Sequence, residues 1–171
     1  MYLITASLLN SWNYLLKSGN TKEFEKVLER VPTPSTEAIE TGFAFEKWCE
    51  NYFPETKDGM FQVTAKKAVG EYLLYGRMDC IKAGTIYDYK YTKRYDVGKF
   101  YDSIQTAMYF ELIPEAKRMS YIISNTKNFS LDTIYREDYT REETQPIWIT
   151  IEQFMKWIKD NGYSMQKWLV K

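Results

Sequence analysis

The chain has 171 residues, of which 44% are hydrophobic and 17% aromatic, enough to bury one substantial core. Its 23 basic residues balance 23 acidic ones, which excludes a strongly basic scaffold and restricts any nucleic-acid contact to a local patch. The chain contains no histidine, which excludes His-based catalytic triads and His-ligated zinc. Its two cysteines are too few to hold an iron–sulfur cluster through four thiolates.

The N-terminal sequence predicts a cytoplasmic protein, and the two cysteines are not expected to pair. Cys49 falls in a helical pattern and Cys80 in a strand pattern, and we interpret both as small buried hydrophobic residues in preference to a disulfide. The N-terminal apolar run is interrupted by Asn10, Ser11 and Asn13 and lacks the basic start and cleavage site of a signal peptide. We therefore expect no contact with a membrane.

Helical patterns dominate the first third of the chain, and strand patterns follow. The helices expected first are one capped by Thr5 or Ser7 and running to Leu16, a second over Thr21–Glu29, and a third capped by Ser35 or Thr36 and running to Tyr52. The later elements expected are strands over Phe61–Val69, Tyr72–Ile81 and Thr85–Tyr91, a helix over Lys99–Leu112, strands over Met119–Ser124 and Leu131–Tyr139, and a helix over Thr150–Asp160.

This order predicts an α/β (α+β) fold with a mixed central sheet of about five strands flanked by helices. We find no repeat, low-complexity tract or interdomain linker, so residues 1–171 are expected to form one domain. Its expected parts are an N-terminal helical segment (1–34), a catalytic core (35–125) and a C-terminal strand and helix (126–171).

The tripeptide Asp88-Tyr89-Lys90 is the strongest candidate for chemistry. It lies inside a strand pattern, where the period of two puts Asp88 and Lys90 on one face. The same acid-x-lysine spacing at Glu55–Lys57 and Glu115–Lys117 lies beside prolines in apparent loops, where no sheet face is available. Context therefore distinguishes the first tripeptide from the other two.

A second acid, Asp79, is expected directly opposite Asp88 if Ala83-Gly84 is a two-residue turn. Facing Cβ atoms are then about 4.5–5.5 Å apart, and two carboxylates at that distance need a neutralising partner such as a hard divalent cation. The backbone carbonyl of Tyr89 could add an oxygen ligand. A three-residue bulged turn would make the pair diagonal, and a solvated face with three charged residues is the alternative without function.

Two helices offer further candidates. Glu46 lies on a largely apolar stripe, where a carboxylate needs a partner, and Gly42 one turn earlier is expected to let the helix approach the sheet closely. A boundary glutamate paired with a lysine is the alternative. Gln105 and Tyr109 are four residues apart and share a helix face, where an amide and a phenol can bind phosphate or metal-bound water.

The ordered set Gly42-x-x-x-Glu46, Asp79, Asp88-x-Lys90 and Gln105-x-x-x-Tyr109 resembles the motifs of the RecB-like and lambda-exonuclease-like (YqaJ) branches of the PD-(D/E)xK nuclease superfamily. Thr5-Ala6-Ser7-Leu8-Leu9-Asn10 is similar to the segment that begins many RecB-type nuclease domains. The resemblance covers residues from about 5 to about 125. Glu46 replaces the histidine of many RecB-type domains, which favours the lambda-exonuclease-like branch or a phage-type relative.

The resemblance implies a restriction-endonuclease-like α/β/α core that cleaves DNA with one or two Mg²⁺ or Mn²⁺ ions and without an iron–sulfur cluster. It implies that Glu46, Asp79 and Asp88 are metal ligands, that Lys90 is the catalytic lysine, and that Gln105 and Tyr109 position substrate or active-site groups. An exonuclease in phage DNA processing, recombination or repair is the implied setting. A recombinase, a single-strand-binding protein or another phage protein is the implied kind of partner.

The segment after the catalytic strand is locally basic and contains interleaved aromatics. Lys93, Arg94 and Lys99 are candidates for phosphate contacts, and Tyr91 or Tyr95 for stacking on an unpaired base. An ordinary solvated loop is the alternative. For the whole chain, the alternatives are a catalytically silent nucleic-acid-binding or protein-interaction domain on the same fold, and a structure- or site-specific endonuclease.

Overall fold

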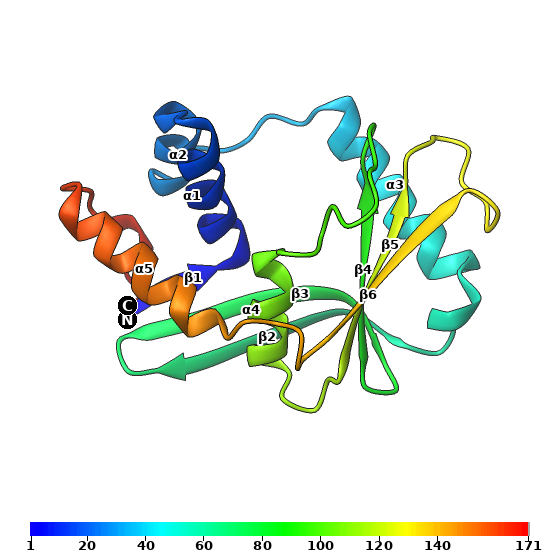
Figure 1. Ribbon diagram of the computed structural model, residues 1–171. Coiled ribbons are helices and arrows are strands. Elements are labelled where there is room, and N and C mark those ends of the chain that lie inside the picture. The colour runs from blue at the N-terminus through cyan, green and yellow to red at the C-terminus, as the bar shows by residue number, and fades with distance from the viewer. Residues whose placement is uncertain (171) are drawn as a thin grey trace.

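A computed structural model describes residues 1–170, which form a six-stranded mixed sheet flanked by five α-helices (Figure 1). The strands are β1 (Tyr2–Thr5), β2 (Met60–Val69), β3 (Tyr72–Lys82), β4 (Thr85–Tyr91), β5 (Arg118–Ser124) and β6 (Ile134–Thr140). The helices are α1 (Ala6–Ser18), α2 (Thr21–Leu28), α3 (Glu37–Tyr52), α4 (Ile104–Leu112) and α5 (Ile147–Asp160), with short 3₁₀ turns at Pro54–Thr56 and Gln166–Trp168.

The sheet has the strand order β1-β3-β4-β5-β6, and β2 pairs with β3 off this path. The pairs β1–β3 and β4–β5 are parallel, whereas β2–β3, β3–β4 and β5–β6 are antiparallel. The predicted mixed α/β fold is therefore confirmed. The strand that was not predicted is β1, whose four residues merge with the apolar run of the first helix.

The helices cover the two faces of the sheet through two separate apolar clusters. Helix α3 contributes Phe45 and Cys49 to a cluster with Tyr87 and Tyr89 of β4. The larger cluster joins α1, α2, α4 and α5 to the sheet, with Met108 of α4 fully buried. Asp88 alternates with Tyr87 and Tyr89 along β4, so it faces away from the α3 cluster. The two cysteines are buried and unpaired, as predicted.

Helix starts follow the capping side chains in the first half of the chain but not in the second. The Thr5 and Thr36 hydroxyls accept the backbone N–H groups of Leu8 and Ile39, as expected of caps. Helix α5, by contrast, begins three residues before the predicted cap Thr150, directly after a proline whose fixed φ suits a helix start.

The predicted start of α4 at Lys99 is also wrong, because the helix begins at Ile104. The carboxylate of Glu137 in β6 accepts the backbone N–H groups of Gly98, Lys99 and Phe100, which holds this segment in turns. Strand β6 itself starts at Ile134, not Leu131, because the preceding residues form a hydrogen-bonded turn between Ser130 and Thr133. Across residues 1–170, no helix is both long and apolar enough to cross a membrane.

Candidate active site

The β3–β4 hairpin has the predicted two-residue turn. Ala83 and Gly84 have φ values of 49° and 75°, which is the type I′ backbone that matches the twist of the strands. Lys82 pairs with Thr85, and continuing this register places Asp79 opposite Asp88. The bulged turn with a diagonal pair of aspartates is therefore excluded.

The two aspartates lie inside the protein and not on a solvated hairpin face. Asp79 is 7% exposed and Asp88 only 2% exposed. Regular pairing between β3 and β4 ends just before them, and Asp79 Oδ2 accepts the backbone N–H of Tyr89 at 2.8 Å. On the other side of β3, Gln62 of β2 has a φ of 52° and lies in a break in the pairing opposite Asp79. The sheet is thus locally irregular on both sides of Asp79.

Asp88 is held by two neighbours. Gln105 Nε2 donates to Asp88 Oδ1 at 2.6 Å, and Lys90 Nζ lies 2.6 Å from Asp88 Oδ2. Asp88 Oδ2 thus lies in an ion pair with the Lys90 ammonium, although the contact lacks the angles of a regular hydrogen bond. Lys90 therefore already places one cation beside this buried oxygen.

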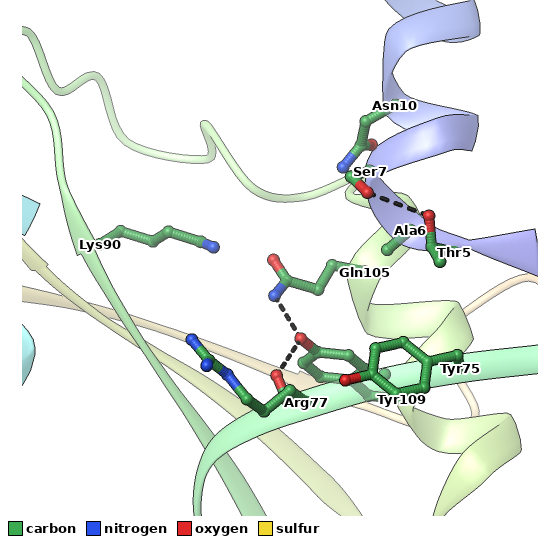
Figure 2. A pocket seen from close by; sticks show the side chains of 10 residues that line it. Thr5, Ala6, Ser7, Asn10, Tyr75, Arg77, Lys90, Gln105 and Tyr109 are labelled. Atoms are coloured by element: carbon green, nitrogen blue, oxygen red, sulfur yellow. Dashed lines mark hydrogen bonds between the residues drawn. The ribbon is translucent and has the colours of Figure 1, made fainter. Parts of the chain in front are cut away.

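Gln105 and Tyr109 act on Asp88 as one network from α4. The Gln105 amide also donates to Tyr109 Oη at 2.8 Å, and the Tyr109 hydroxyl donates to the carbonyl of Arg77 at 2.6 Å (Figure 2). Gly76 of β3 leaves room for the Tyr109 ring, since a Cβ at this position would lie 2.8 Å from the ring. The network therefore ties the orientation of Asp88 to the backbone of β3.

Burial and neighbouring charges at the site shift several pKa values. Burial and the charge of Asp88 raise the pKa of Asp79 well above its ordinary value, and the Tyr89 N–H opposes them only in part. Burial tends to lower the pKa of Lys90, but the nearby Asp88 outweighs it and leaves the pKa raised, so Lys90 stays charged. The raised pKa of Asp79 means that this carboxyl takes up a proton readily next to Asp88, and a hard cation bound between the two aspartates would take the place of that proton.

Glu46 approaches the same charges from α3. Burial raises the pKa of this half-buried carboxylate, and although Arg77 and Lys90 lower it, the added effect of Asp88 leaves the pKa raised. The expectation for Gly42 is wrong, because a Cβ at this position would meet open space and not the sheet. Within residues 1–170, no three or more Cys, Asp or Glu side chains are arranged as a ready metal cluster. The residues that fit a cation best are therefore Asp79 and Asp88, because Mg²⁺ is commonly held by one or two carboxylates and waters.

A cavity of about 340 Å³ opens beside Lys90 (Figure 2). Lys90 reaches into it from β4, Gln105 and Tyr109 from α4, and polar side chains from the start of α1 and from β3 complete the wall, namely Ser7, Asn10, Tyr75 and Arg77. These four residues were not predicted as site residues. Alternation along the strand is a signal that could have indicated Arg77, which lies two residues before Asp79.

The predicted DNA-binding residues lie in the segment after β4, but several are engaged within the protein. Tyr95 donates its hydroxyl to Glu137 at 2.8 Å, and Tyr91 packs against the α3 cluster. Lys99 Nζ donates to Thr92 Oγ1 and to the carbonyl of Arg94. Of the predicted DNA-binding residues, Lys93 and Arg94 are exposed, and Arg94 Nε lies 3.9 Å from Asp96 Oδ2 in an exposed ion pair.

Comparison with known proteins shows a shared fold. No family model and no curated protein matches the chain. The crystal structure of SSO0001 gives a TM-score of 0.61 at 13% identity, over 93% of this chain and 76% of that one. An alkaline exonuclease, LHK-Exo from Laribacter hongkongensis, gives 0.51 at 9% identity over 92% of this chain and 88% of that one. LHK-Exo in complex with dAMP gives 0.53 at 10% identity with the same coverage. The chain therefore has the mixed α/β fold of an alkaline exonuclease.

Proposed function

We propose that this chain is a metal-dependent deoxyribonuclease that hydrolyses DNA phosphodiester bonds, and that it acts as an exonuclease. The observation that carries the proposal is the buried pair Asp79 and Asp88, which face each other on neighbouring strands beside the charged Lys90. The shared fold with an exonuclease whose crystal structure contains dAMP supports DNA as the substrate.

Asp79 and Asp88 would hold Mg²⁺ or Mn²⁺ together with the Tyr89 carbonyl, and Glu46 would move from its present position to become a further ligand. A bound ion of this kind polarises a phosphate and lowers the pKa of a bound water. Lys90, at the wall of the cavity, stabilises charge that develops on the phosphate oxygens. Gln105 and Tyr109 keep Asp88 oriented, and Lys93 and Arg94 contact the DNA backbone.

A setting in phage DNA processing, recombination or repair agrees with this reaction, with a recombinase or single-strand-binding protein as partner. Two other functions are compatible with the fold, namely a silent nucleic-acid-binding domain and an endonuclease. The silent domain is disfavoured because the buried carboxyl groups of Asp79 and Asp88 raise the energy of the fold unless they serve a ligand or substrate.

Incubation of the protein with linear and circular duplex DNA in Mg²⁺, Mn²⁺ or EDTA distinguishes these functions. An exonuclease degrades the linear DNA in either metal ion, leaves the circle intact, and is inactive in EDTA. Nicking of the circle would assign an endonuclease. Persistence of both substrates in Mg²⁺ and Mn²⁺ would refute the proposed activity and favour a silent binding domain.

A further inference from the structure

A second cavity of about 450 Å³ lies next to the cavity at Lys90. The two share the wall formed by Thr5, Ser7 and Tyr75. Both volumes fall in the range of roughly 300–1,000 Å³ that is usual for pockets that hold small ligands. The second cavity is therefore large enough for a group of nucleotide size and is reached from the active site across Ser7 and Tyr75. Its remaining lining residues are Leu3, Arg30, Lys66, Leu73, Trp168 and Val170.

The second cavity has cationic side chains and no acidic ones among the described residues that line it. Lys66 lies over the Tyr75 ring at 5.8 Å, and neither Lys66 nor Arg30 forms an ion pair within residues 1–170. The next residue of β2, Lys67, instead pairs with Glu111 at 2.6 Å. Lys66 and Lys67 are adjacent and point to opposite faces of β2. Lys67 is neutralised by Glu111, whereas Lys66 has no acidic partner within residues 1–170 and lines the cavity.

Arg30 is held in place before any ligand arrives. Its guanidinium lies 5.0 Å from the centroid of the Trp168 ring and donates to the carbonyl of Lys167 at 3.3 Å. Trp168 is itself fixed, because its indole N–H donates to the carbonyl of Leu28 at 2.8 Å and the residue is 6% exposed. A guanidinium held in one orientation loses less entropy when it binds a phosphate, which favours an anion on this side of the second cavity.

We propose that the second cavity binds a single-stranded segment of nucleic acid that continues past the scissile phosphate. This inference rests on the proposed nuclease function, because the strand must enter from the site at Lys90. Phosphates of the strand would lie against Arg30 and Lys66 after the strand crosses Ser7 and Tyr75. The preferred substrate is thus a duplex with a single-stranded extension, and the released product is an oligonucleotide and not only a mononucleotide.

The test measures binding and cleavage separately on the whole chain. Fluorescence anisotropy in EDTA compares a blunt duplex with duplexes that carry a 5′ or a 3′ extension of six nucleotides, for the wild type, Lys66→Ala, Lys66→Arg and the matched control Lys67→Ala. We expect an extension on one of the two ends to tighten binding about tenfold. Lys66→Ala is expected to remove most of this gain. It is also expected to reduce the steepness of the plot of log binding constant against log salt concentration by about 0.7, the value for one phosphate contact on a single strand. Lys66→Arg and Lys67→Ala retain the gain.

The outcomes distinguish this inference from the proposed function. Equal affinity for blunt and extended duplexes, or equal loss in Lys66→Ala and Lys67→Ala, overturns the inference even if the protein cleaves DNA in Mg²⁺. A gain from the extension that depends on Lys66, in a protein that cleaves no DNA, sustains the strand site and overturns the nuclease. In an active protein, gel analysis of end-labelled extended DNA in Mg²⁺ is expected to show products longer than one nucleotide, and products of mononucleotides alone contradict the inference.

Discussion

The Asp79 carboxylate accepts the backbone N–H of Tyr89 at 2.8 Å, so a side chain replaces a backbone partner where β3 and β4 separate. This hydrogen bond gives Asp79 a structural role besides its proposed role as a metal ligand. It also links β3 and β4 at the point where their regular backbone pairing, which begins at the turn, comes to an end. The two roles of Asp79 can be tested separately because an amide retains the acceptor and loses the charge.

We predict that Asp79→Ala is less stable than Asp79→Asn by about 1–3 kcal/mol, the cost of leaving a buried N–H without a partner. Both substitutions remove the repulsion with Asp88, so their difference isolates the hydrogen bond. Urea denaturation monitored by tryptophan fluorescence gives the two free energies of unfolding. Equal stability of the two variants would show that the Tyr89 N–H has another acceptor. Neither variant is expected to retain metal-dependent cleavage.

Gly76 and Gly42 form a matched pair for stability. A Cβ at Gly76 would lie 2.7 Å from Leu112 Cδ1 and 2.8 Å from the Tyr109 ring, so Gly76→Ala is predicted to cost about 1–3 kcal/mol. Gly42 lies in the interior of α3, and a Cβ there would have no atom within 4 Å. Gly42→Ala is therefore predicted to stabilise the protein by about 0.5–1 kcal/mol. Thermal unfolding of both variants shows whether Gly76→Ala lowers the melting temperature and Gly42→Ala raises it. A neutral Gly76→Ala would mean that α4 can shift without loss.

Tyr109→Phe removes the hydroxyl that donates to the Arg77 carbonyl and accepts from Gln105. We expect a loss of about 0.5–1.5 kcal/mol in stability, typical of one hydrogen bond, since the ring still packs against Gly76. Because Gln105 then holds Asp88 less firmly, kcat for DNA cleavage is expected to fall about tenfold with little change in KM. A change confined to KM would instead assign Tyr109 to substrate binding.

The lowered pKa of Glu137 leads us to predict that the stability of the fold decreases at acidic pH. Burial tends to raise its pKa, but hydrogen bonds from Tyr139, Tyr95 and the backbone of Phe100 and Gly98 outweigh burial and leave the pKa lowered. Because the folded pKa is below the unfolded value of about 4.3, the contribution to stability is present above that pH and is lost as the pH falls through the folded pKa.

We therefore expect Glu137→Gln to lose less stability than the wild type between about pH 5 and pH 3, because the amide does not titrate in this range. Urea denaturation at several pH values measures the two slopes. Parallel slopes would contradict the role of this carboxylate. Hydrogen exchange at Gly98 and Lys99 is expected to speed up in the variant, since their N–H groups donate to Glu137.

Local patterns predicted the hairpin because its determinants are close in sequence. Two-residue periodicity and the Ala83-Gly84 turn are sufficient to place Asp79 opposite Asp88, and i, i+4 spacing is sufficient to place Gln105 beside Tyr109. The late start of α4 depends instead on Glu137, which comes from a strand that is distant in sequence. No local pattern contains such a contact.

Parts of the candidate site were unpredictable for the same reason. Ser7 and Asn10 line the cavity at Lys90 only because parallel pairing of β1 with β3 brings the start of α1 to this side of the site. Strand β1 has too few residues to show a period of its own. The open space beside Gly42 likewise follows from how α3 is set on the sheet, which helix periodicity does not specify.

The initial rate of hydrolysis of linear duplex DNA in Mg²⁺, measured for matched variants, tests the proposed active site most directly. Asp88→Asn and Lys90→Ala are each predicted to lower the rate by at least about 10²–10³, the usual effect of removing a group that stabilises the transition state. Lys117→Ala is the control, because Glu115–Lys117 has the same spacing outside the sheet. Circular dichroism checks that each variant is folded. Loss of activity in the first two variants and wild-type activity in the control is the predicted result, and a folded Asp88→Asn or Lys90→Ala variant with wild-type activity would contradict the assigned site.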